Sequence, residues 1–370
     1  MNRTKVNTVS IITPCLNSES TIRKTIESVL RQSYHNIEYI IIDGNSTDKT
    51  VNIIEEYAPL FEKRLQYISE KDDGIYDAMN KGIRMAKGDV IGIINSDDWY
   101  EDDAVEQVMK CFNDKLADVV YGRIYQVDEE GKRTNYVHRE LETIWYQMAI
   151  PHPSTFVRKV VYQELGMFNT KFSISADYEL MLRLYSSGVR FEYINKYLAN
   201  FRIGGISQQS ENLAWKELYE AAFLYIERCK QYDKFFSILK ENYEYFLLET
   251  LLEKEPYKFQ DMLNSFWKEK IQEIIIFGIG NWGEKCYKAL KQTDIMVRCF
   301  LDNGNRLNEK HGKVVCRPES VQVRNVHILI AVRHHADDIR KQLQELHADS
   351  IASIGELVQA YLSYSELMQR

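Results

Sequence analysis

Residues 8–43 read TVSIITPCLNSESTIRKTIESVLRQSYHNIEYIIID, and their pattern of apolar residues predicts the fold class. "TVSIIT" predicts a buried strand, which a loop rich in Asn and Ser follows. Four later apolar residues fall on one face of a helix: Ile22, Ile26, Val29 and Leu30. "IEYIIID" then predicts a second strand that ends in Asp43. A strand, a helix and a second strand in succession are typical of a parallel sheet with crossover helices, so the predicted fold class is α/β.

The same alternation continues beyond this stretch. "LQYIS" and "DVIGIIN" predict two more strands, and the helix between them should turn four apolar residues inward: Ile75, Met79, Ile83 and Ala86. Residues 118–206 differ, because "DVVYGRIYQVD" and "RTNYVH" predict a hairpin and "DYELMLRLYSSG" predicts a later helix. From about residue 207 to 270 the chain is aromatic and helical, and "IQEIIIFGIGNWGEKCYKALKQ" then restarts a strand, a turn and a helix. We therefore predict a larger α/β domain at 1–206, a helical connector at 207–270 and a smaller α/β domain at 271–370.

Composition narrows the class of function. The 370 residues carry a net charge of -7, which argues against general nucleic-acid binding because that needs a basic surface. The six cysteines show no CxxC pairing and no zinc-type spacing, so we expect reduced thiols in a cytoplasmic protein. The first residues contain too short an apolar stretch for a signal peptide, and no apolar run reaches the roughly 18 residues of a membrane-spanning helix.

Acidic residues recur where the predicted strands end. Ligands of open α/β sheets bind beyond the carboxyl ends of the strands, where these acids would gather: Asp43, Asp72, Asp73 and Asp97. "NSDD" at residues 95–98 places two adjacent carboxylates at such an end, which suits a hard divalent cation such as Mg²⁺ or Mn²⁺. The alternative is an acidic cap for the following helix, and the two interpretations stand about level on these residues alone.

Several separate motifs in the right order resemble one known family. "VSIITPCLNSESTIRKTIESVLRQSYHNIEYIIIDGNSTDKT", followed by "GIYDAMNKGIRMAKGDVIGIINSDD", resembles the family 2 glycosyltransferases of the GT-A type fold, especially bacterial polysaccharide enzymes of the colanic-acid type. The resemblance covers residues 8 to about 206. It implies a GT-A type nucleotide-sugar-binding domain.

The resemblance also implies a donor site. In the family the loop after the first strand and the Asp ending the second strand hold the nucleotide base, which here points to Pro14, Asn17 and Asp43. Asp72 would contact base or ribose, and Lys81 would face the diphosphate. The alternatives are a turn-forming role for Asp43, a solvated acidic run around Asp72 and a surface lysine at residue 81.

The family places a D-x-D type motif at the end of the fourth strand. Here Asn95 stands where the first Asp often stands, Asp97 takes the second position and Asp98 follows. Asn95 brings no charge, so metal binding would rest on Asp97, with Asp98 as a helper or cap. The expected cofactor is Mn²⁺ or Mg²⁺.

An inverting sugar transfer needs a base for the acceptor hydroxyl. "SADYELMLRL" resembles the family's base-bearing segment, which assigns this role to Asp177, with a helix N-cap as the alternative. His152 in "IPHPSTF" would line the acceptor side or stiffen its loop. Arg202 in "NFRIGGIS" would contact diphosphate oxygens or serve as a structural ion-pair partner.

The last hundred residues resemble the small Rossmann-like modules that accompany sugar-modifying enzymes. "FGIGNWG" supplies three glycines after a strand and before a helix, and an acid ends the next strand; the four residues are Gly278, Gly280, Gly283 and Asp302. They predict either close helix packing in an interaction module or a site for a nucleotide.

Together these features predict an inverting, metal-dependent glycosyltransferase that moves a sugar from a nucleotide-sugar donor, a UDP-sugar, to a glycan or lipid-linked glycan acceptor. We expect it to act in surface polysaccharide synthesis in the cytoplasm. Peripheral contact with the inner face of the plasma membrane and assembly into a homo-oligomer are both left open. One alternative is a nucleotide- or NAD-sensing protein led by the C-terminal domain. A sugar-phosphate nucleotidyltransferase is the other, although "TPCLNSEST" lacks the glycine and lysine of its basic loop.

Overall fold

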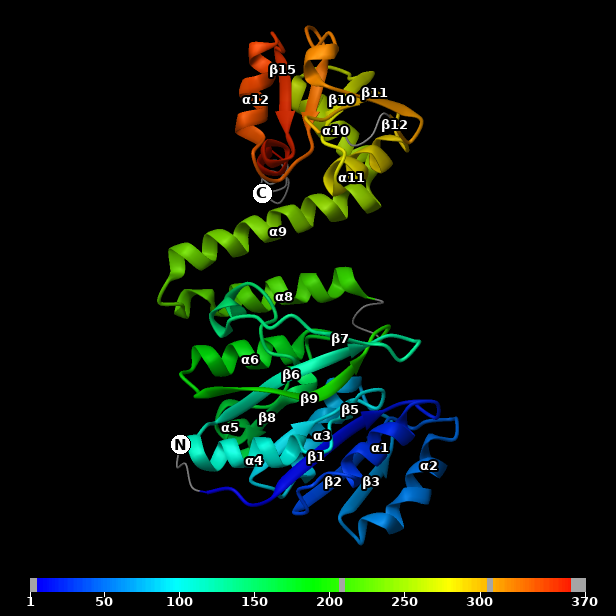
Figure 1. Ribbon diagram of the computed structural model, residues 1–370, viewed down its shortest axis with the longest axis vertical. Coiled ribbons are helices and arrows are strands. Elements are labelled where there is room, and N and C mark those ends of the chain that lie inside the picture. Colours follow the sequence, from blue (N-terminus) through cyan, green and yellow to red (C-terminus); the bar gives the residue numbers. More distant parts are fainter. Residues whose placement is uncertain (1–4, 206–209, 305–308, 361–370) are drawn as a thin grey trace. The chain divides into compact units, whose positions relative to one another are not determined.

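The computed structural model describes residues 5–205, 210–304 and 309–360, and the chain divides into two compact units, Met1–Leu239 and Lys240–Arg370. Each unit contains a sheet of its own, and Figure 1 labels the elements. The mixed α/β class predicted from the sequence is confirmed in both units.

One sheet organises the N-terminal unit. Its strands are β1 (Val9–Cys15), β2 (Ile37–Asp43), β3 (Leu65–Ser69), β4 (Val90–Ile93), β5 (Trp99–Tyr100), β6 (Val119–Val127), β7 (Arg133–Asn135), β8 (Thr155–Arg158) and β9 (Phe191–Arg202). They lie in the order β3-β2-β1-β4-β8-β6-β9-β5, with β7 paired to β6. The first four strands of this order are parallel neighbours, as predicted, and β6 and β7 form the predicted hairpin. Because β1, β2 and β4 are parallel, their carboxyl ends meet on one rim, and β8 runs antiparallel to both β4 and β6.

Helices cover both faces of this sheet. They are α1 (Ile22–Leu30), α2 (Thr50–Tyr57), α3 (Ile75–Met85), α4 (Ala104–Lys115), α5 (Lys159–Leu165), α6 (Ala176–Ser186) and α8 (Glu211–Tyr225). α1, α2 and α4 share one core with alternate residues of the strands, such as Val9 and Ile11. α3 lies against the opposite face, where a Cβ added to Gly82 would come 2.4 Å from the Ile12 side chain. The expectation that Ile75 is buried is wrong, because this residue opens α3 at the sheet rim and is 36% exposed.

The C-terminal unit has a second sheet, ordered β12-β13-β11-β10-β14-β15. Its strands are β10 (Glu273–Phe277), β11 (Met296–Leu301), β12 (Glu309–Lys310), β13 (Lys313–Cys316), β14 (His327–Ile330) and β15 (Ser350–Ser353). β10 is central and runs parallel to both of its neighbours, β11 and β14. The glycine-rich turn connects it to α11 (Asn281–Leu290), as predicted, and α12 (Ala336–Glu345) precedes β15. Successive β10 residues alternate between the cores on the two faces, which explains the uninterrupted apolar run of this strand.

Residues 211–267 are largely helical, as their composition predicts. Besides α8 they form α9 (Tyr232–Lys254) and α10 (Pro256–Trp267), and the division between the two units falls inside α9. α8 packs against α6, whereas α10 packs within the core of the C-terminal unit. In the described part of the chain, no helix combines the length and the apolar character that crossing a bilayer requires.

Candidate active site

A cavity of about 560 Å³ lies at the carboxyl ends of β1 and β4 in the N-terminal unit. It gathers side chains from segments that are far apart in the sequence, including the loops after β1 and β4, the start of α3 and the start of α6. Among its lining residues are several singled out from the sequence: Pro14, Asn17, Asp72, Asn95, Asp97, His152 and Asp177. Four other candidates of this unit lie outside the lining: Asp43, Lys81, Asp98 and Arg202.

The loop after β1 is held by the loop after β2. Asn17 adopts a left-handed backbone with φ of 48°, and its side-chain oxygen accepts a hydrogen bond of 2.9 Å from the amide of Thr47. Asp43 is fully buried and accepts from the amide of Ser46 at 3.0 Å and from the hydroxyl of Ser69 at 2.6 Å. The carboxylate of Asp43 therefore orders the turn beneath the cavity, which is the structural alternative that the sequence suggested.

Asp72 faces the cavity next to a glycine. One carboxylate oxygen accepts from the amide of Gly74 at 3.0 Å, and the other would lie 2.6 Å from a Cβ added to Gly44. Gly44 thus provides space for the Asp72 carboxylate. Lys81 lies elsewhere: its ammonium group pairs with Glu70 at 2.9 Å, so that it is neutralised away from the cavity lining.

The adjacent acids at the end of β4 have separate environments. Asp97 lines the cavity, and burial raises the pKa of its carboxyl while the positive charge of Arg202 opposes this rise. Asp98 points away and is fully buried, so burial raises the pKa of its carboxyl well above the ordinary value. One oxygen of Asp98 accepts from the backbone amide of Arg202 at 2.9 Å and thereby fastens the end of β9.

The side-chain oxygen atoms around Asp97 suit a hard cation that a bound ligand also coordinates. The side-chain oxygen of Asn95 and one carboxylate oxygen of Asp98 are buried without a hydrogen-bond partner. Within the described residues, no three His, Cys, Asp or Glu side chains cluster as a metal site. Mg²⁺ and Mn²⁺ are commonly held by one or two carboxylates plus substrate phosphates, so Asp97 with Asn95 nearby fits such a cation.

Asp177 sits in the first turn of α6 and faces the cavity. One of its carboxylate oxygens, Oδ1, accepts from the amide of Tyr178 at 2.8 Å and from the hydroxyl of Tyr76 at 3.2 Å. Burial raises the pKa of Asp177, whereas the proximity of His152 lowers it. Burial also lowers the pKa of His152, which favours its neutral form. The arrangement leaves Oδ2 of Asp177 as the oxygen that can accept a proton from a bound ligand.

Tyr76 was not identified from the sequence. Met79, Ile83 and Ala86 are buried as predicted, but Tyr76 rather than Ile75 occupies the first buried position of α3. Both residues fit a helical spacing, because Ile75 lies four residues before Met79 and Tyr76 lies three residues before it.

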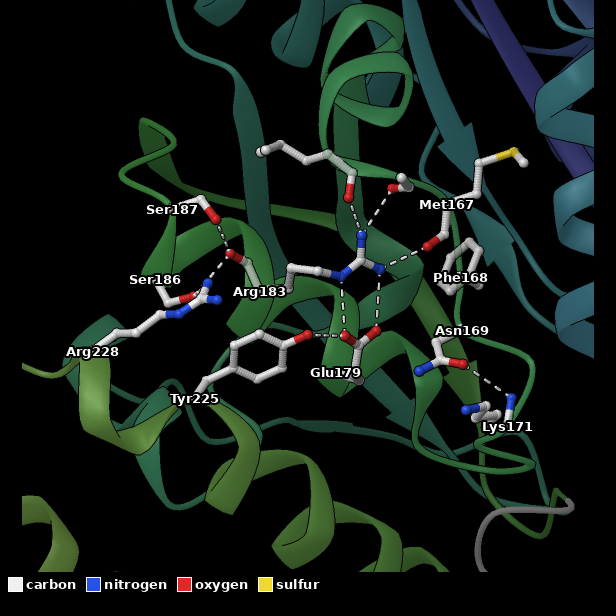
Figure 2. A network of polar contacts seen from close by, with 12 residues as sticks. Met167, Phe168, Asn169, Lys171, Glu179, Arg183, Ser186, Ser187, Tyr225 and Arg228 are labelled. Atoms are coloured by element: carbon white, nitrogen blue, oxygen red, sulfur yellow. Dashed lines mark hydrogen bonds and ion pairs between the residues drawn. The ribbon is translucent and has the colours of Figure 1, made fainter.

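A buried ion pair anchors α6, the helix that also carries Asp177 (Figure 2). The Arg183 guanidinium meets the carboxylate of Glu179, which is 1% exposed, through two bonds of 3.0 and 3.1 Å. It also donates to three successive backbone carbonyls of residues 165–167. The hydroxyl of Tyr225 on α8 donates to the same Glu179 carboxylate at 2.6 Å. Glu179 therefore has a structural role and lies outside the cavity lining, unlike Asp177.

The comparison with protein families gives a match over this same cavity. The family model described as "Glycosyl transferase family 2" matches residues 10–177, from β1 to Asp177. Residues 10–177 belong to glycosyl transferase family 2.

Similar proteins carry this family 2 domain in different settings. The PGL/p-HBAD biosynthesis glycosyltransferase of Mycobacterium tuberculosis is 29% identical over 205 residues, which are 54% of this chain and 78% of that protein. The chondroitin synthase of Pasteurella multocida is 26% identical over 353 residues, which are 93% of this chain but 34% of that protein. This chain thus spans about a third of the chondroitin synthase.

Solved structures share the fold of the family 2 domain. S. aureus TarS has a TM-score of 0.55 at 16% identity, covering 70% of this chain and 48% of that one. A mannosyltransferase from Pyrobaculum calidifontis, in complex with GDP-Man and Mn²⁺, has a TM-score of 0.50 at 17% identity, covering 69% of this chain and 73% of that one. At these identities the likeness shows the fold, which confirms the predicted GT-A type architecture.

The glycines of the C-terminal unit lie outside the family 2 domain. A second family model, "C2185-like, N-terminal", matches residues 270–351. Gly278 has φ of +107°, and a Cβ on Gly283 would lie 1.9 Å from the Gly278 carbonyl oxygen, whereas Gly280 has no neighbour within 4 Å. Asp302 accepts from the amide of Gly304 at 2.7 Å and so closes a turn after β11. Gly278 and Gly283 therefore serve the close approach of strand and helix.

Proposed function

We propose that the chain is an inverting glycosyltransferase that uses Mn²⁺ or Mg²⁺ to transfer a hexosyl or hexosaminyl group from a UDP-sugar. The observation that carries this proposal is the convergence of Asp97 and Asp177 on one cavity at the carboxyl rim of a family 2 domain. An inverting transfer needs one anionic site for the leaving diphosphate with its cation and one separate base, and the cavity offers a candidate for each.

The donor would occupy the part of the cavity between the loop after β1 and the end of β4. Pro14 and Asn17 would form a wall for the base, and the carboxylate of Asp72 would accept a hydrogen bond from a ribose hydroxyl or a base N–H. TarS, which shares the fold, has been crystallised with UDP and with UDP-GlcNAc, which favours a uridine nucleotide for this chain.

Asp97, with the amide oxygen of Asn95 nearby, would hold the divalent cation against the donor diphosphate. Such a cation neutralises the charge that develops on the leaving diphosphate. The mannosyltransferase that shares the fold was solved with Mn²⁺, which supports the same choice here. The Arg202 side chain adds positive charge near Asp97, close enough to lower the pKa of that carboxyl.

Asp177 would act as the base. As the acceptor oxygen attacks the anomeric carbon, the hydroxyl proton passes to Oδ2 of Asp177, and the bond from that carbon to the diphosphate breaks with its electrons leaving on the diphosphate. Tyr76 and the amide of Tyr178 hold Oδ1 and so fix the carboxylate orientation. His152 lines the same cavity near Asp177, and we propose that it faces the acceptor.

The acceptor would be a glycan or a lipid-linked glycan, and the setting would be surface polysaccharide synthesis. The names of two relatives, a chondroitin synthase and a PGL/p-HBAD biosynthesis glycosyltransferase, support an extracellular glycan or glycolipid product. We propose that the protein acts in the cytoplasm, with peripheral contact at the inner face of the plasma membrane.

A nucleotide-sugar hydrolysis panel tests the proposal. Wild type, Asp97→Ala and Asp177→Asn are assayed with UDP- and GDP-sugars, with and without Mn²⁺. We expect Mn²⁺-stimulated hydrolysis of a UDP-sugar, loss of this stimulation in Asp97→Ala, and a fall in kcat of about 10²- to 10⁴-fold in Asp177→Asn, as for loss of a general base.

Asp73→Asn is the matched control, because this exposed carboxylate adjoins Asp72 but lies outside the cavity lining. The proposal fails if neither cavity variant lowers the turnover of any donor. It also fails if the control lowers turnover as much as they do.

A further inference from the structure

The segment before Asp177 is held by a residue from a distant helix. Glu217, in the middle of α8, accepts hydrogen bonds from three successive backbone amides: Ser173 at 2.8 Å, Ile174 at 2.8 Å and Ser175 at 2.9 Å. The first goes to one carboxylate oxygen and the other two go to the second oxygen. Bonds from amides to a charged acceptor are about twice as strong as neutral ones, so this contact holds the segment firmly.

Within the described residues, the three amides are the hydrogen-bond partners of the Glu217 carboxylate. Its side chain is buried, with the residue 6% exposed. Among the residues that the structure describes, no lysine or arginine forms an ion pair with it. The three amides precede the first residue of α6, Ala176, where the helix dipole also favours a negative charge. The buried carboxylate is therefore satisfied by the backbone of this one segment.

This segment lines the cavity. Ser173 and Ile174 contribute to the lining, and Asp177 follows Ser175 by two residues. The carbonyl oxygen of Ile174 and Oδ1 of Asp177 are both acceptors for the Tyr76 hydroxyl. A shift of these amides would consequently move both Asp177 and the tyrosine that orients it.

α8 forms two further hydrogen bonds with α6 and the residue before it. The hydroxyl of Ser175 donates to the carbonyl of Ala214 at 2.9 Å, one turn before Glu217. At the other end of α8, Tyr225 donates to Glu179 (Figure 2). The contacts at residues 214, 217 and 225 span most of α8, so the helix braces α6 along its length.

We propose that Glu217 is a positioning residue for Asp177, which makes α8 a working part of the active site. The inference rests on the proposed function, because it assumes that Asp177 is the base. Glu217 itself does not line the cavity, so it acts through the backbone of Ser173–Ser175.

The test compares Glu217→Gln with Glu220→Gln in the full-length protein. Glutamine keeps the shape of the glutamate side chain but turns an NH₂ group toward a backbone amide that also donates. Glu220 pairs with Lys216 on the exposed side of the same helix, so Glu220→Gln is the control. For Glu217→Gln we expect kcat for UDP-sugar hydrolysis to fall about 10- to 100-fold, because small displacements of a catalytic group have effects of this size. UDP affinity should stay within about twofold of wild type, and Glu220→Gln should match wild type in both.

Hydrogen exchange measures the brace directly. Amides of residues 173–175 should exchange at least about tenfold faster in Glu217→Gln than in wild type, because they lose a charged acceptor. If Glu217→Gln does not fold, Glu217→Asp replaces it, since the shorter side chain keeps the charge but cannot reach all three amides. Reduced kcat at unchanged UDP affinity supports the inference in either variant.

Wild-type kcat in the folded variant, with unchanged exchange at residues 173–175, overturns the inference. Asp177→Asn, assayed alongside, separates this outcome from failure of the proposed function. If Asp177→Asn loses turnover while Glu217→Gln does not, only the positioning role fails. If Asp177→Asn turns over like wild type, the base assignment itself fails.

Discussion

Replacing Arg183 with methionine should destabilise the N-terminal unit by about 3–5 kcal/mol, the usual cost of removing one partner from a buried ion pair. Its partner Glu179 is 1% exposed, while Arg183 itself is 16% exposed, so neither charge is well solvated. Methionine fills part of the volume, but among the described residues it leaves Tyr225 as the side-chain donor to the Glu179 carboxylate. It also removes the donor to the carbonyls of residues 165–167.

The double variant Glu179→Leu, Arg183→Met provides the sharper comparison. It removes both charges, so we expect it to be more stable than Arg183→Met alone, by about 1 kcal/mol or more. Calorimetry is the assay, because the two compact units can unfold separately and a single two-state fit would mislead. For a unit of this size the single variant should lower its Tm by roughly 6–20 °C. A loss below about 1 kcal/mol in the single variant, or a double variant as unstable as the summed single changes, would refute the reasoning.

Two further changes test the site and the C-terminal turn. Tyr76→Phe removes a hydrogen bond that lowers the pKa of Asp177, so the pKa of this carboxyl should rise. A base with a raised pKa loses its proton only at higher pH, so the acidic limb of the pH profile of kcat/KM should move to higher pH. A limb at the same or a lower pH contradicts this. Gly283→Ala should lower the stability of the C-terminal unit by about 1–3 kcal/mol, because the new Cβ would lie 1.9 Å from a backbone oxygen. Gly280→Ala is the control, because a Cβ at that position has no neighbour within 4 Å. Equal Tm values of the two variants in calorimetry would argue against the packing role of Gly283.

Local pattern predicted the architecture of the first hundred residues well. The parallel core of β1, β2, β3 and β4 followed from buried apolar runs, and two of the acids at strand ends, Asp72 and Asp97, line the cavity at the rim of this sheet. In α3 one of the four predicted inward residues was wrong, because Tyr76 rather than Ile75 is buried ahead of Met79. Sequence spacing alone could not choose between these two residues, since both fit a helical period.

The different environments of adjacent acids were harder to predict. Asp97 and Asp98 are neighbours, yet one lines the cavity and the other binds the amide of Arg202. That contact joins residues more than a hundred positions apart, and its geometry depends on how β9 returns beside β5. Glu217 poses the same difficulty, because nothing in the local sequence of α8 shows which amides its carboxylate will meet.

The brace formed by α8 affects how related sequences are compared. The family match ends at residue 177, and the helix that supplies Glu217 begins at residue 211. Two chains could therefore score alike over the matched region while only one keeps the acceptor for the amides of residues 173–175. Substitutions at position 217 would escape a survey restricted to the family motifs, although they would remove the acceptor for the amides that precede Asp177. A functional alignment of such enzymes should extend through α8.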